Sequence, residues 1–323
     1  MITIEVTKKP DLNWNKRLIK AQLGTTNQTI ERGINFDRTG QSPRFMKFID
    51  NNGNIVGQLL FSISSRLDKK GLPGKVLKRI TGLKLPLYFW IYGPIIFDQE
   101  KNEDIFSSLR NFLNSKKCKV YGTTNPLIPT DPDILKKNFQ ITEWATYIID
   151  LRKSKEELYN NIEKHSGRKN IERAIKRGVT IEEINEKSLV KYHEIRTKFQ
   201  ETLEEKKTDF KHMLAYWKLM KPLGFSGFLA KKGGIEIGGL MFHYFNNVIV
   251  EAGVARSKQD LVEKLYAHDL IKWKIIEWGV KNKMKYYDLA GFNLHPKLKK
   301  EEGIKRYKTK WGGQKYSYWI IKK

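Results

Sequence analysis

The chain has little of what metal, redox and nucleotide chemistry usually requires. Its 323 residues include one cysteine and six histidines, and none of the tight spacings of zinc ligands occurs. The sequence contains no Gly-x-x-x-x-Gly-Lys loop and no Gly-x-Gly-x-x-Gly fingerprint, and no Ser-His-Asp triad can be assembled from local motifs. We therefore expect no metal site and no bound cofactor.

A second cysteine and a long apolar run are absent too. Cys118 stands alone, which excludes an intramolecular disulfide and indicates a reducing compartment. The most apolar stretch, 83–97, is interrupted by lysine, proline and glycine and is shorter than the ~20 residues needed to span a bilayer. The first residues, MITIE, contain no apolar signal core. We expect a cytoplasmic protein, and contact with the inner surface of the membrane stays open.

Acidic residues are scarce relative to basic ones. The chain has 61 Lys and Arg against 35 Asp and Glu, a formal net charge of +26. Such an excess favours polyanionic partners such as nucleic acid, anionic lipid or phosphorylated substrates. The alternative is a basic surface that only keeps the protein soluble. The basic residues cluster, however, in the segments 66–84, 152–178 and 293–323.

Two segments far apart in the chain have the same pattern. Hairpins are expected at 45–61, around Asn-Gly, and at 225–242, around Gly-Gly, because apolar strands flank each turn. A strand, a helix and a strand follow each hairpin, at 88–92, 103–116 and 119–123, and at 248–254, 257–281 and 286–289. The repeat predicts a duplicated α/β domain with a mixed sheet, of the acetyltransferase (GNAT-like) type.

A helical segment is expected between 154 and 178. Ser154 and Glu157 form a capping box, Gly178 ends the helix, and Ser166-Gly167 predicts a kink or break within it. Its apolar face is expected at Leu158, Ile162, Ile171 and Ile175. The buried stripe of the helix 257–281 is expected at Leu261, Leu265, Ile271, Ile275 and Trp278. A further helical stretch at 187–222 is too short for a long coiled-coil arm.

Three stretches resemble the FemABX family of aminoacyltransferases, which build peptidoglycan cross-bridges. They are YGPIIFD at 92–98, the segment from IDL at 149–151 through the basic helix to Gly178, and a C-terminal run with YDLAG at 287–291, GIKRYK at 303–308 and WGG at 311–313. The resemblance implies two tandem GNAT-like domains, at 1–146 and 147–312, and a C-terminal strand at 313–323 that packs back on the first domain. It also implies an acyltransferase that forms an amide bond.

Acyl transfer to an amine needs a neutral amine, a nearby carbonyl and stabilisation of the oxyanion. Lys308 is the catalytic candidate, because it follows an aromatic residue as the family's lysine does, where that lysine is thought to stabilise the tetrahedral intermediate. The aromatic residue here is Tyr307, a candidate for substrate binding, instead of the more usual Phe. The alternative is one more solvated lysine in a basic tail. Lys310 lies outside the motif and is expected to be dispensable.

Two carboxylates are further catalytic candidates. Asp288 ends a strand at the position of the family's Tyr-Asp-Leu-Gly-Gly segment, where it either orients Lys308 or a substrate amine or caps the turn at Gly291. Glu251 lies in an otherwise apolar strand, so it is either buried as a base with a raised pKa or directed to solvent at a strand edge. The family has an aromatic residue at that place.

Residues for the acceptor follow from the resemblance alone. Tyr216 matches a family tyrosine on the phosphorylated acceptor, and Lys211 or His212 replaces the family's arginine. The alternative for the Tyr216-Trp217 pair is helix core. Of the N-terminal Gln-x-x-x-Trp segment, Gln28 is present, whereas the tryptophan and an acceptor-binding lysine are not. The resemblance implies a cell-wall precursor peptide, anionic or lipid-linked, as the acceptor.

The donor implied by the resemblance is aminoacyl-tRNA. Lys299, Lys300, Lys305 and Arg306 are the candidate residues for its phosphates. The turn before the second long helix, ARSKQD at 255–260, lacks the glycines with which GNAT enzymes usually hold acetyl-CoA. An acyl-CoA-dependent N-acyltransferase for a polysaccharide or lipid amine, and a non-catalytic RNA-binding module, stay open as alternatives. We expect a monomer.

Overall fold

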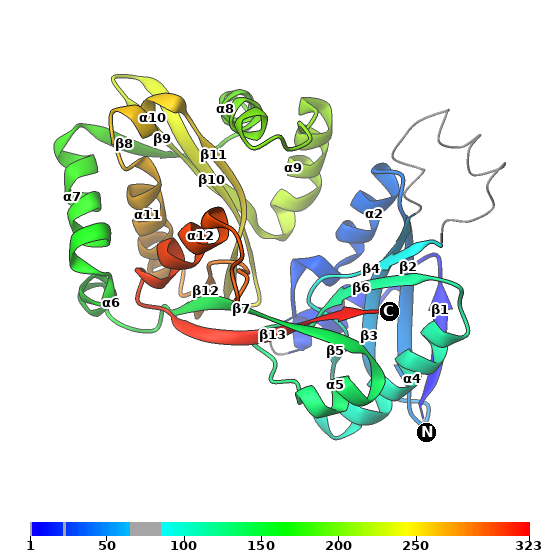
Figure 1. The fold of residues 1–323 in the computed structure, drawn as a ribbon. Coiled ribbons are helices and arrows are strands. Elements are labelled where there is room, and N and C mark those ends of the chain that lie inside the picture. Colours follow the sequence, from blue (N-terminus) through cyan, green and yellow to red (C-terminus); the bar gives the residue numbers. More distant parts are fainter. Residues whose placement is uncertain (1, 22–23, 65–84) are drawn as a thin grey trace. The chain divides into compact units, whose positions relative to one another are not determined.

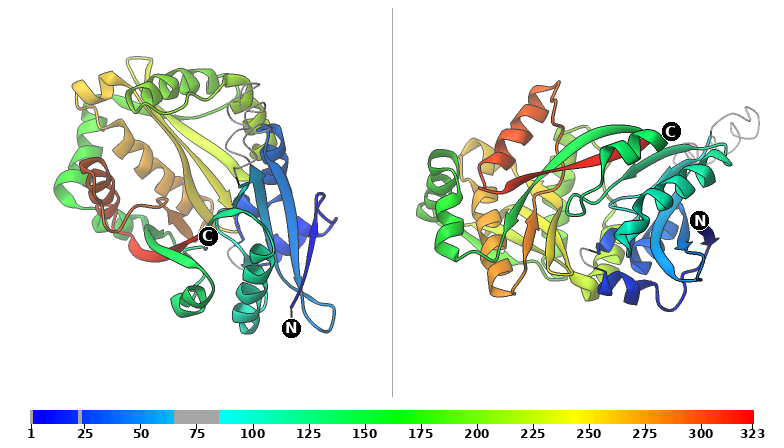
Figure 2. Two further views of the ribbon diagram at one scale, coloured as in Figure 1. Left: turned by 45° about the vertical axis from the view of Figure 1, so that its right-hand side comes forward. Right: turned by 90° about the horizontal axis from the view of Figure 1, so that it is seen from below.

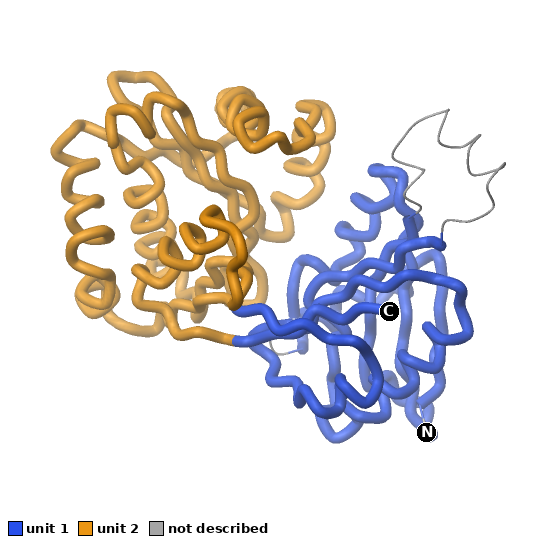
Figure 3. The backbone as a smooth tube through the Cα atoms, in the orientation of Figure 1, with its two compact units in different colours: residues 1–145, 317–323 blue, residues 146–316 orange. Residues whose placement is uncertain are grey.

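The computed structural model describes residues 2–21, 24–64 and 85–323. The chain divides into two compact units, residues 1–145 with 317–323 and residues 146–316 (Figure 3). The basic segment 66–84 lies outside the described residues. Within them, no helix combines the length and the apolar character needed to cross a bilayer.

The first unit is a mixed sheet with helices on both faces. Its strands lie in the order β1 (Thr3–Thr7), β2 (Ser42–Ile49), β3 (Ile55–Ser64), β4 (Leu87–Phe89), β6 (Lys119–Thr123) and β13 (Gln314–Lys322), with β5 (Ile95–Ile96) beside β3. Only the β4–β6 pair is parallel. Its helices are α1 (Trp14–Lys20), α2 (Ile30–Arg38), α4 (Asn102–Asn114) and α5 (Pro132–Asn138), with short 3-10 turns at Thr26–Gln28 and Gln99–Lys101.

Alternation along the strands separates the two faces of this sheet. Met46 and Phe48 of β2 pack with the apolar side of α4, whereas Phe45 packs with α1 and α2. Asn52 and Gly53 form the predicted turn between β2 and β3, and Gly53 has a φ of +81°. The predicted hairpin and the strand 119–123 are confirmed.

The second unit repeats this arrangement. Its strands lie in the order β7 (Gln140–Asp150), β12 (Tyr286–Asp288), β11 (Val248–Arg256), β10 (Ile235–Phe245), β9 (Phe225–Lys232) and β8 (Val179–Glu183). The β11–β12 pair is parallel and the other pairs are antiparallel. This unit contains α6 (Lys155–Asn161), a π-helical turn at Lys164–Arg168, α7 (Lys169–Lys176), α8 (Leu189–Thr202), α9 (Phe210–Gly224), α10 (Lys258–Val262), α11 (Ala267–Lys281) and α12 (Lys299–Thr309).

The helices of the second unit cover both faces of its sheet (Figures 1 and 2). Leu240 and Phe242 of β10 pack in the core that contains α11, and Met241 between them packs in the core that contains α8 and α9. Both α8 and α9 lie against the sheet, so the described residues contain no long coiled-coil arm. The predicted duplication of an α/β unit with a mixed sheet is therefore confirmed.

Two helix predictions need correction. The predicted helix 257–281 is divided into α10 and α11, because Lys264 and Tyr266 have positive φ angles of 53° and 57°. Leu261 is consequently exposed and does not belong to the buried stripe. In the segment 154–178 the helix breaks at Ile162, before the predicted Ser166-Gly167 pair, and Ile175 is exposed.

Candidate active site

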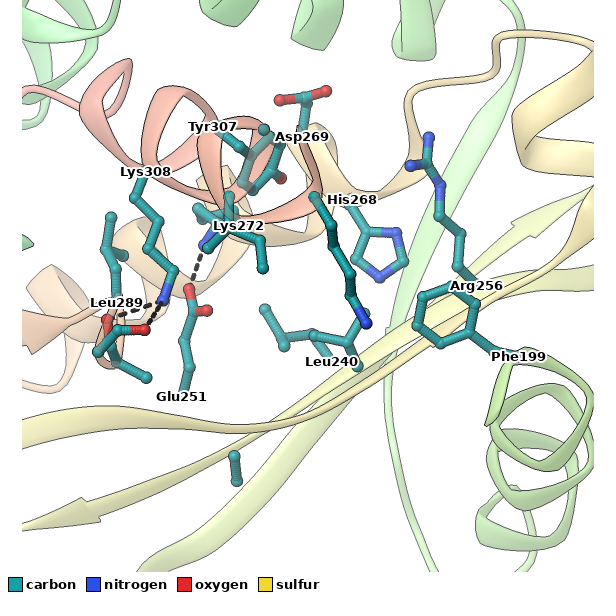
Figure 4. Close-up of a pocket in the computed structure, with 17 residues that line it drawn as sticks. Phe199, Leu240, Glu251, Arg256, His268, Asp269, Lys272, Leu289, Tyr307 and Lys308 are labelled. Atoms are coloured by element: carbon teal, nitrogen blue, oxygen red, sulfur yellow. Dashed lines mark hydrogen bonds and ion pairs between the residues drawn. The ribbon is translucent and has the colours of Figure 1, made fainter. Parts of the chain in front are cut away.

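A pocket of about 580 Å³ opens within the second unit. It is bounded by β10, β11, the turn after β12, α8, α11 and α12. Figure 4 shows Lys308, Lys272 and Glu251 at one end, Arg256 and Phe199 at the other, and Leu240 and His268 between them. The lining therefore combines a charged end, a mostly apolar middle and a basic end.

Lys308 is held at the charged end by backbone carbonyl groups. Its Nζ donates to the carbonyl oxygens of Ala290, at 2.8 Å, and Gly291, at 2.9 Å. An ammonium group has three N–H donors, so one is left for a ligand. Burial lowers the pKa of Lys308 to about 8, and Lys272 adds to this effect, whereas Glu251 and Asp288 act in the opposite direction. Lys308 is thus a half-buried pocket residue and not a solvated lysine of a basic tail.

Asp288 shapes the turn that holds Lys308. Its buried carboxylate accepts hydrogen bonds from the Ala290 amide, at 2.9 Å, and from the Thr146 hydroxyl, at 2.5 Å. Ala290 has a φ of +62°, so the turn is strained for a residue with a side chain and benefits from this cap. The turn-capping role holds, and Asp288 fixes the turn whose Ala290 and Gly291 carbonyls bind Lys308.

Glu251 is paired inside the pocket and does not point to solvent. Its Oε1 accepts from Tyr287, at 2.6 Å, and forms an ion pair with Lys272. Its Oε2 has no hydrogen-bond partner among the described residues. Lys272 is 2% exposed, and its ammonium lies 5.3 Å from the centre of the Tyr307 ring. The solvent-edge alternative for Glu251 is therefore wrong.

A second buried ion pair joins Asp269 and Lys310. Lys310 also donates to the Ser166 carbonyl oxygen at 2.8 Å, and its side chain is 8% exposed. Burial lowers the pKa of Lys310, against the attraction of Asp269. Lys310 is therefore not a solvated lysine and is unsuited as a neutral control, because its loss would leave a buried carboxylate without its cation.

Tyr307 lies in the pocket wall on the same helix as Lys308. Burial raises the pKa of Tyr307 well above its usual value, and Asp269 and Glu251 add to this effect. Its hydroxyl has no hydrogen-bond partner among the described residues. The hydroxyl itself is buried, so Tyr307 contributes to the pocket as a wall residue.

Helix α12 separates two pockets. One of its faces lines the site, whereas Glu302, Lys305, Arg306 and Thr309 line a second pocket of about 530 Å³. Of the candidate phosphate contacts, Lys300 is on the first face, Lys305 and Arg306 are on the second, and Lys299 is exposed. The four residues share one helix but not one surface.

The predicted acceptor residues lie apart from this pocket. Lys211 and His212 are exposed on α9, where His212 pairs with Asp209 at 3.5 Å. Tyr216 is half-buried, with its hydroxyl 3.0 Å from His243 Nε2. Trp217 is 2% exposed, so the helix-core alternative holds for this tryptophan. None of the three candidates lines the pocket around Lys308.

Several pocket residues were not predicted from the sequence. Lys272 and Asp269 lie on the buried side of α11, and His268 and Arg256 line the wall. The sequence did contain a signal for Lys272, since it lies within an apolar stripe next to Ile271, Ile275 and Ile276. A lysine is rarely buried without a partner, so its place in that stripe indicates a buried ion pair. No cluster of metal-ligating side chains occurs among the described residues.

Solved structures establish the fold. No protein-family model and no curated protein sequence matches the chain. FemX matches with a TM-score of 0.72 at 13% identity, covering 98% of this chain and 97% of its own. The C-terminal domain of a putative lysylphosphatidylglycerol synthetase from Agrobacterium fabrum matches with a TM-score of 0.58 at 9% identity, covering 95% and 92%.

A third similar structure is itself described as a tandem GNAT protein. It comes from the clavulanic acid biosynthesis pathway and matches with a TM-score of 0.54 at 9% identity, covering 100% of this chain and 98% of its own. The chain therefore has a FemX-like tandem GNAT fold over its full length.

Proposed function

We propose that this protein is an acyltransferase that forms an amide bond in the pocket of the second unit. The acyl group is an aminoacyl group carried by tRNA, and the acceptor is an amine of a cell-wall precursor peptide. The FemX-like fold supports this assignment, and the arrangement of Lys308 beside Glu251 carries it.

The remaining N–H of Lys308 is suited to stabilise the oxyanion of a tetrahedral intermediate. The carbonyl oxygens of Ala290 and Gly291 fix its position before the reaction, so little reorganisation is needed. Tyr307 forms the adjoining wall of the pocket from the same helix. Asp288 contributes through the turn that holds Lys308.

Glu251 is suited to accept the proton of the attacking amine through its free Oε2. As the amide C–N bond forms, the ester C–O bond to the terminal ribose breaks, and the proton from the amine passes to the leaving hydroxyl. Lys272 and Tyr287 hold the other oxygen and keep the carboxylate in place.

The main alternative donor is acyl-CoA. The start of α11 disfavours a pyrophosphate there, because Asp260 already accepts from the Ala267 amide, at 2.9 Å, and pairs with Arg256 at 2.7 Å. A net charge of +26 and the basic residues of α12 favour tRNA. A non-catalytic RNA-binding module would keep that affinity without any transfer.

The decisive test is the Lys308→Met variant. We expect its kcat to fall by about 10²- to 10³-fold with little change in KM, because the lost interaction exists only in the tetrahedral state. Lys308→Arg should also fail, because a planar guanidinium places its charge differently. Lys315→Met is the control, since Lys315 is exposed and should keep full activity. Equal activity of the Lys308→Met and Lys315→Met proteins in transfer of labelled aminoacyl groups would end this proposal.

The donor is tested separately by tRNA binding. If n phosphates are neutralised, log affinity should fall almost linearly with log salt, with a slope of roughly 0.7n to 0.9n. Charge reversal of Lys299, Lys300, Lys305 and Arg306 should weaken binding more than reversal of an equal number of dispersed lysines. Mass spectrometry of the purified protein complements this test, because retained CoA would favour the alternative donor.

A further inference from the structure

We infer that the middle of this pocket binds a hydrocarbon side chain of the acyl group, and that Gly303 sets the size of the side chain it accepts. The inference rests on the proposed acyl transfer and names the class of acyl group. An apolar middle would make the pocket selective for apolar aminoacyl groups over charged ones.

The apolar wall lies between the two charged ends. Leu240 of β10 and Val254 of β11 are directly paired across the sheet. Phe199 of α8 and Ile304 of α12 complete this part of the lining. Figure 4 shows Leu240 between the Lys308 end and the Arg256 end. A side chain attached to a carbonyl carbon beside Lys308 would meet these four hydrocarbon groups, with the imidazole of His268 beside them.

The charges of the pocket disfavour a cationic side chain. Each carboxylate of the lining already has a cation: Glu251 pairs with Lys272, and Asp269 pairs with Lys310. Lys300, Lys308 and Arg256 add further positive charge. A buried ammonium would therefore lose its hydration without gaining an unpaired carboxylate. An anionic side chain would lose its hydration against the same apolar wall.

Gly303 leaves open space in this wall. It lies within α12 and lines the pocket, and a Cβ added there would have no heavy atom within 4 Å beyond its own helix backbone and chain neighbours. Its φ is not positive, so another residue fits the backbone without strain. A side chain at 303 would therefore begin in open space on the pocket wall.

The test is isothermal titration of the full chain with 3′-aminoacylamino-3′-deoxyadenosines, stable analogues of the end of a charged tRNA. Alanyl, leucyl, lysyl and aspartyl forms differ only in the side chain. We expect the leucyl form to bind best, and the lysyl and aspartyl forms to bind about tenfold more weakly or worse.

Gly303→Leu should reverse the order of the two apolar ligands. Binding of the leucyl form should weaken by roughly tenfold or more, and binding of the alanyl form should change by less than about threefold. Gly303→Ala should weaken leucyl binding by an intermediate amount. Thermal unfolding checks that the variants are intact, and leucine or alanine should raise the stability of a helix that carries glycine.

Three results would overturn this inference: lysyl binding as tight as leucyl binding, no binding of any analogue, or equal weakening of all four ligands in Gly303→Leu. Each of these leaves the transferase proposal standing, since that proposal depends on Lys308→Met. Conversely, a full preference for the leucyl form together with an active Lys308→Met protein would support the subsite and contradict the proposed role of Lys308.

Discussion

The two units have the same strand order, yet among the described residues only the second buries charged side chains. Among the described residues, the buried polar side chains of the first unit are uncharged, whereas the second unit buries Asp260, Asp269, Lys272 and Asp288. The matching helices differ in the same way. The buried residues of α4 are Ile105, Phe106, Leu109 and Leu113, while α11 places Asp269 and Lys272 among its apolar residues.

This difference separates polar groups that pair with the backbone from charged groups that lie around a pocket. Gln28 of the first unit accepts from the Leu60 amide, at 2.7 Å, and donates to the Ile91 carbonyl, at 2.9 Å, so it only satisfies backbone groups. Buried ion pairs, by contrast, are weak contributors to stability and are expensive to break. The second unit nevertheless keeps two of them, Glu251–Lys272 and Asp269–Lys310, around one pocket, as the proposed transfer site would require.

The largest effect is expected from breaking the Lys272–Glu251 pair. Lys272→Met leaves a buried carboxylate unpaired and should cost about 3–5 kcal/mol in the free energy of unfolding. Lys274→Met on the same helix is the matched control and should cost less than about 1 kcal/mol, because its partner Glu277 forms an exposed pair. Urea denaturation measures both. Adding Glu251→Gln to Lys272→Met should restore much of the stability, and failure to do so would contradict the charge argument.

The converse change puts a charge into the first unit. Gln28→Glu keeps the shape of the side chain. It replaces the N–H donor, which now faces the carbonyl oxygens of Leu60 and Ile91, with a carboxylate oxygen. We expect a loss of about 2–4 kcal/mol at neutral pH. Because the folded-state pKa of this glutamate would be raised, the loss should shrink as the pH falls through that pKa. A variant as stable as the wild type at pH 7 would show that the first unit also tolerates buried charge.

A further effect concerns the pH dependence of stability. The pKa of Lys308 is lowered to about 8 in the folded protein, so between pH 8 and its unfolded value of 10.5 the unfolded chain binds more protons. This lysine should therefore make the protein more stable as pH rises through that window, by at most about 1.4 kcal/mol per pH unit. Subtracting the curve of Lys308→Met isolates its contribution. Two parallel curves would contradict the burial of this ammonium.

Local patterns predicted the strands better than the helix breaks. Alternation around Asn-Gly and Gly-Gly specified both hairpins, and the strand 119–123 has the predicted bounds. The break before α11 was missed because Lys264 and Tyr266 adopt positive φ angles without a glycine to indicate it. Such residues take that conformation because their surroundings require it, which a single sequence does not express.

The candidate site was predicted only where a motif marked it. Lys308, Tyr307 and Asp288 were found through the resemblance, and Glu251 through its place in an apolar strand. Lys272 was missed because lysine is normally assigned to the solvent side of a helix, and its partner is 21 residues earlier in the chain. Ion pairs between distant elements leave no periodic signal. The acceptor candidates on α9 stay predictions.

The position of β13 has a consequence for synthesis on the ribosome. Its residues Ile320–Lys322 pair with Tyr121–Thr123 of β6, so the sheet of the first unit contains a strand that is translated after the whole of the second. Until that strand emerges, β6 presents an open edge, the kind of surface that attracts other chains. The first unit is therefore translated first and completed last. Removal of residues 317–323 should lower the stability of the first unit, residues 1–145, and leave the stability of the second unit, residues 146–316, unchanged.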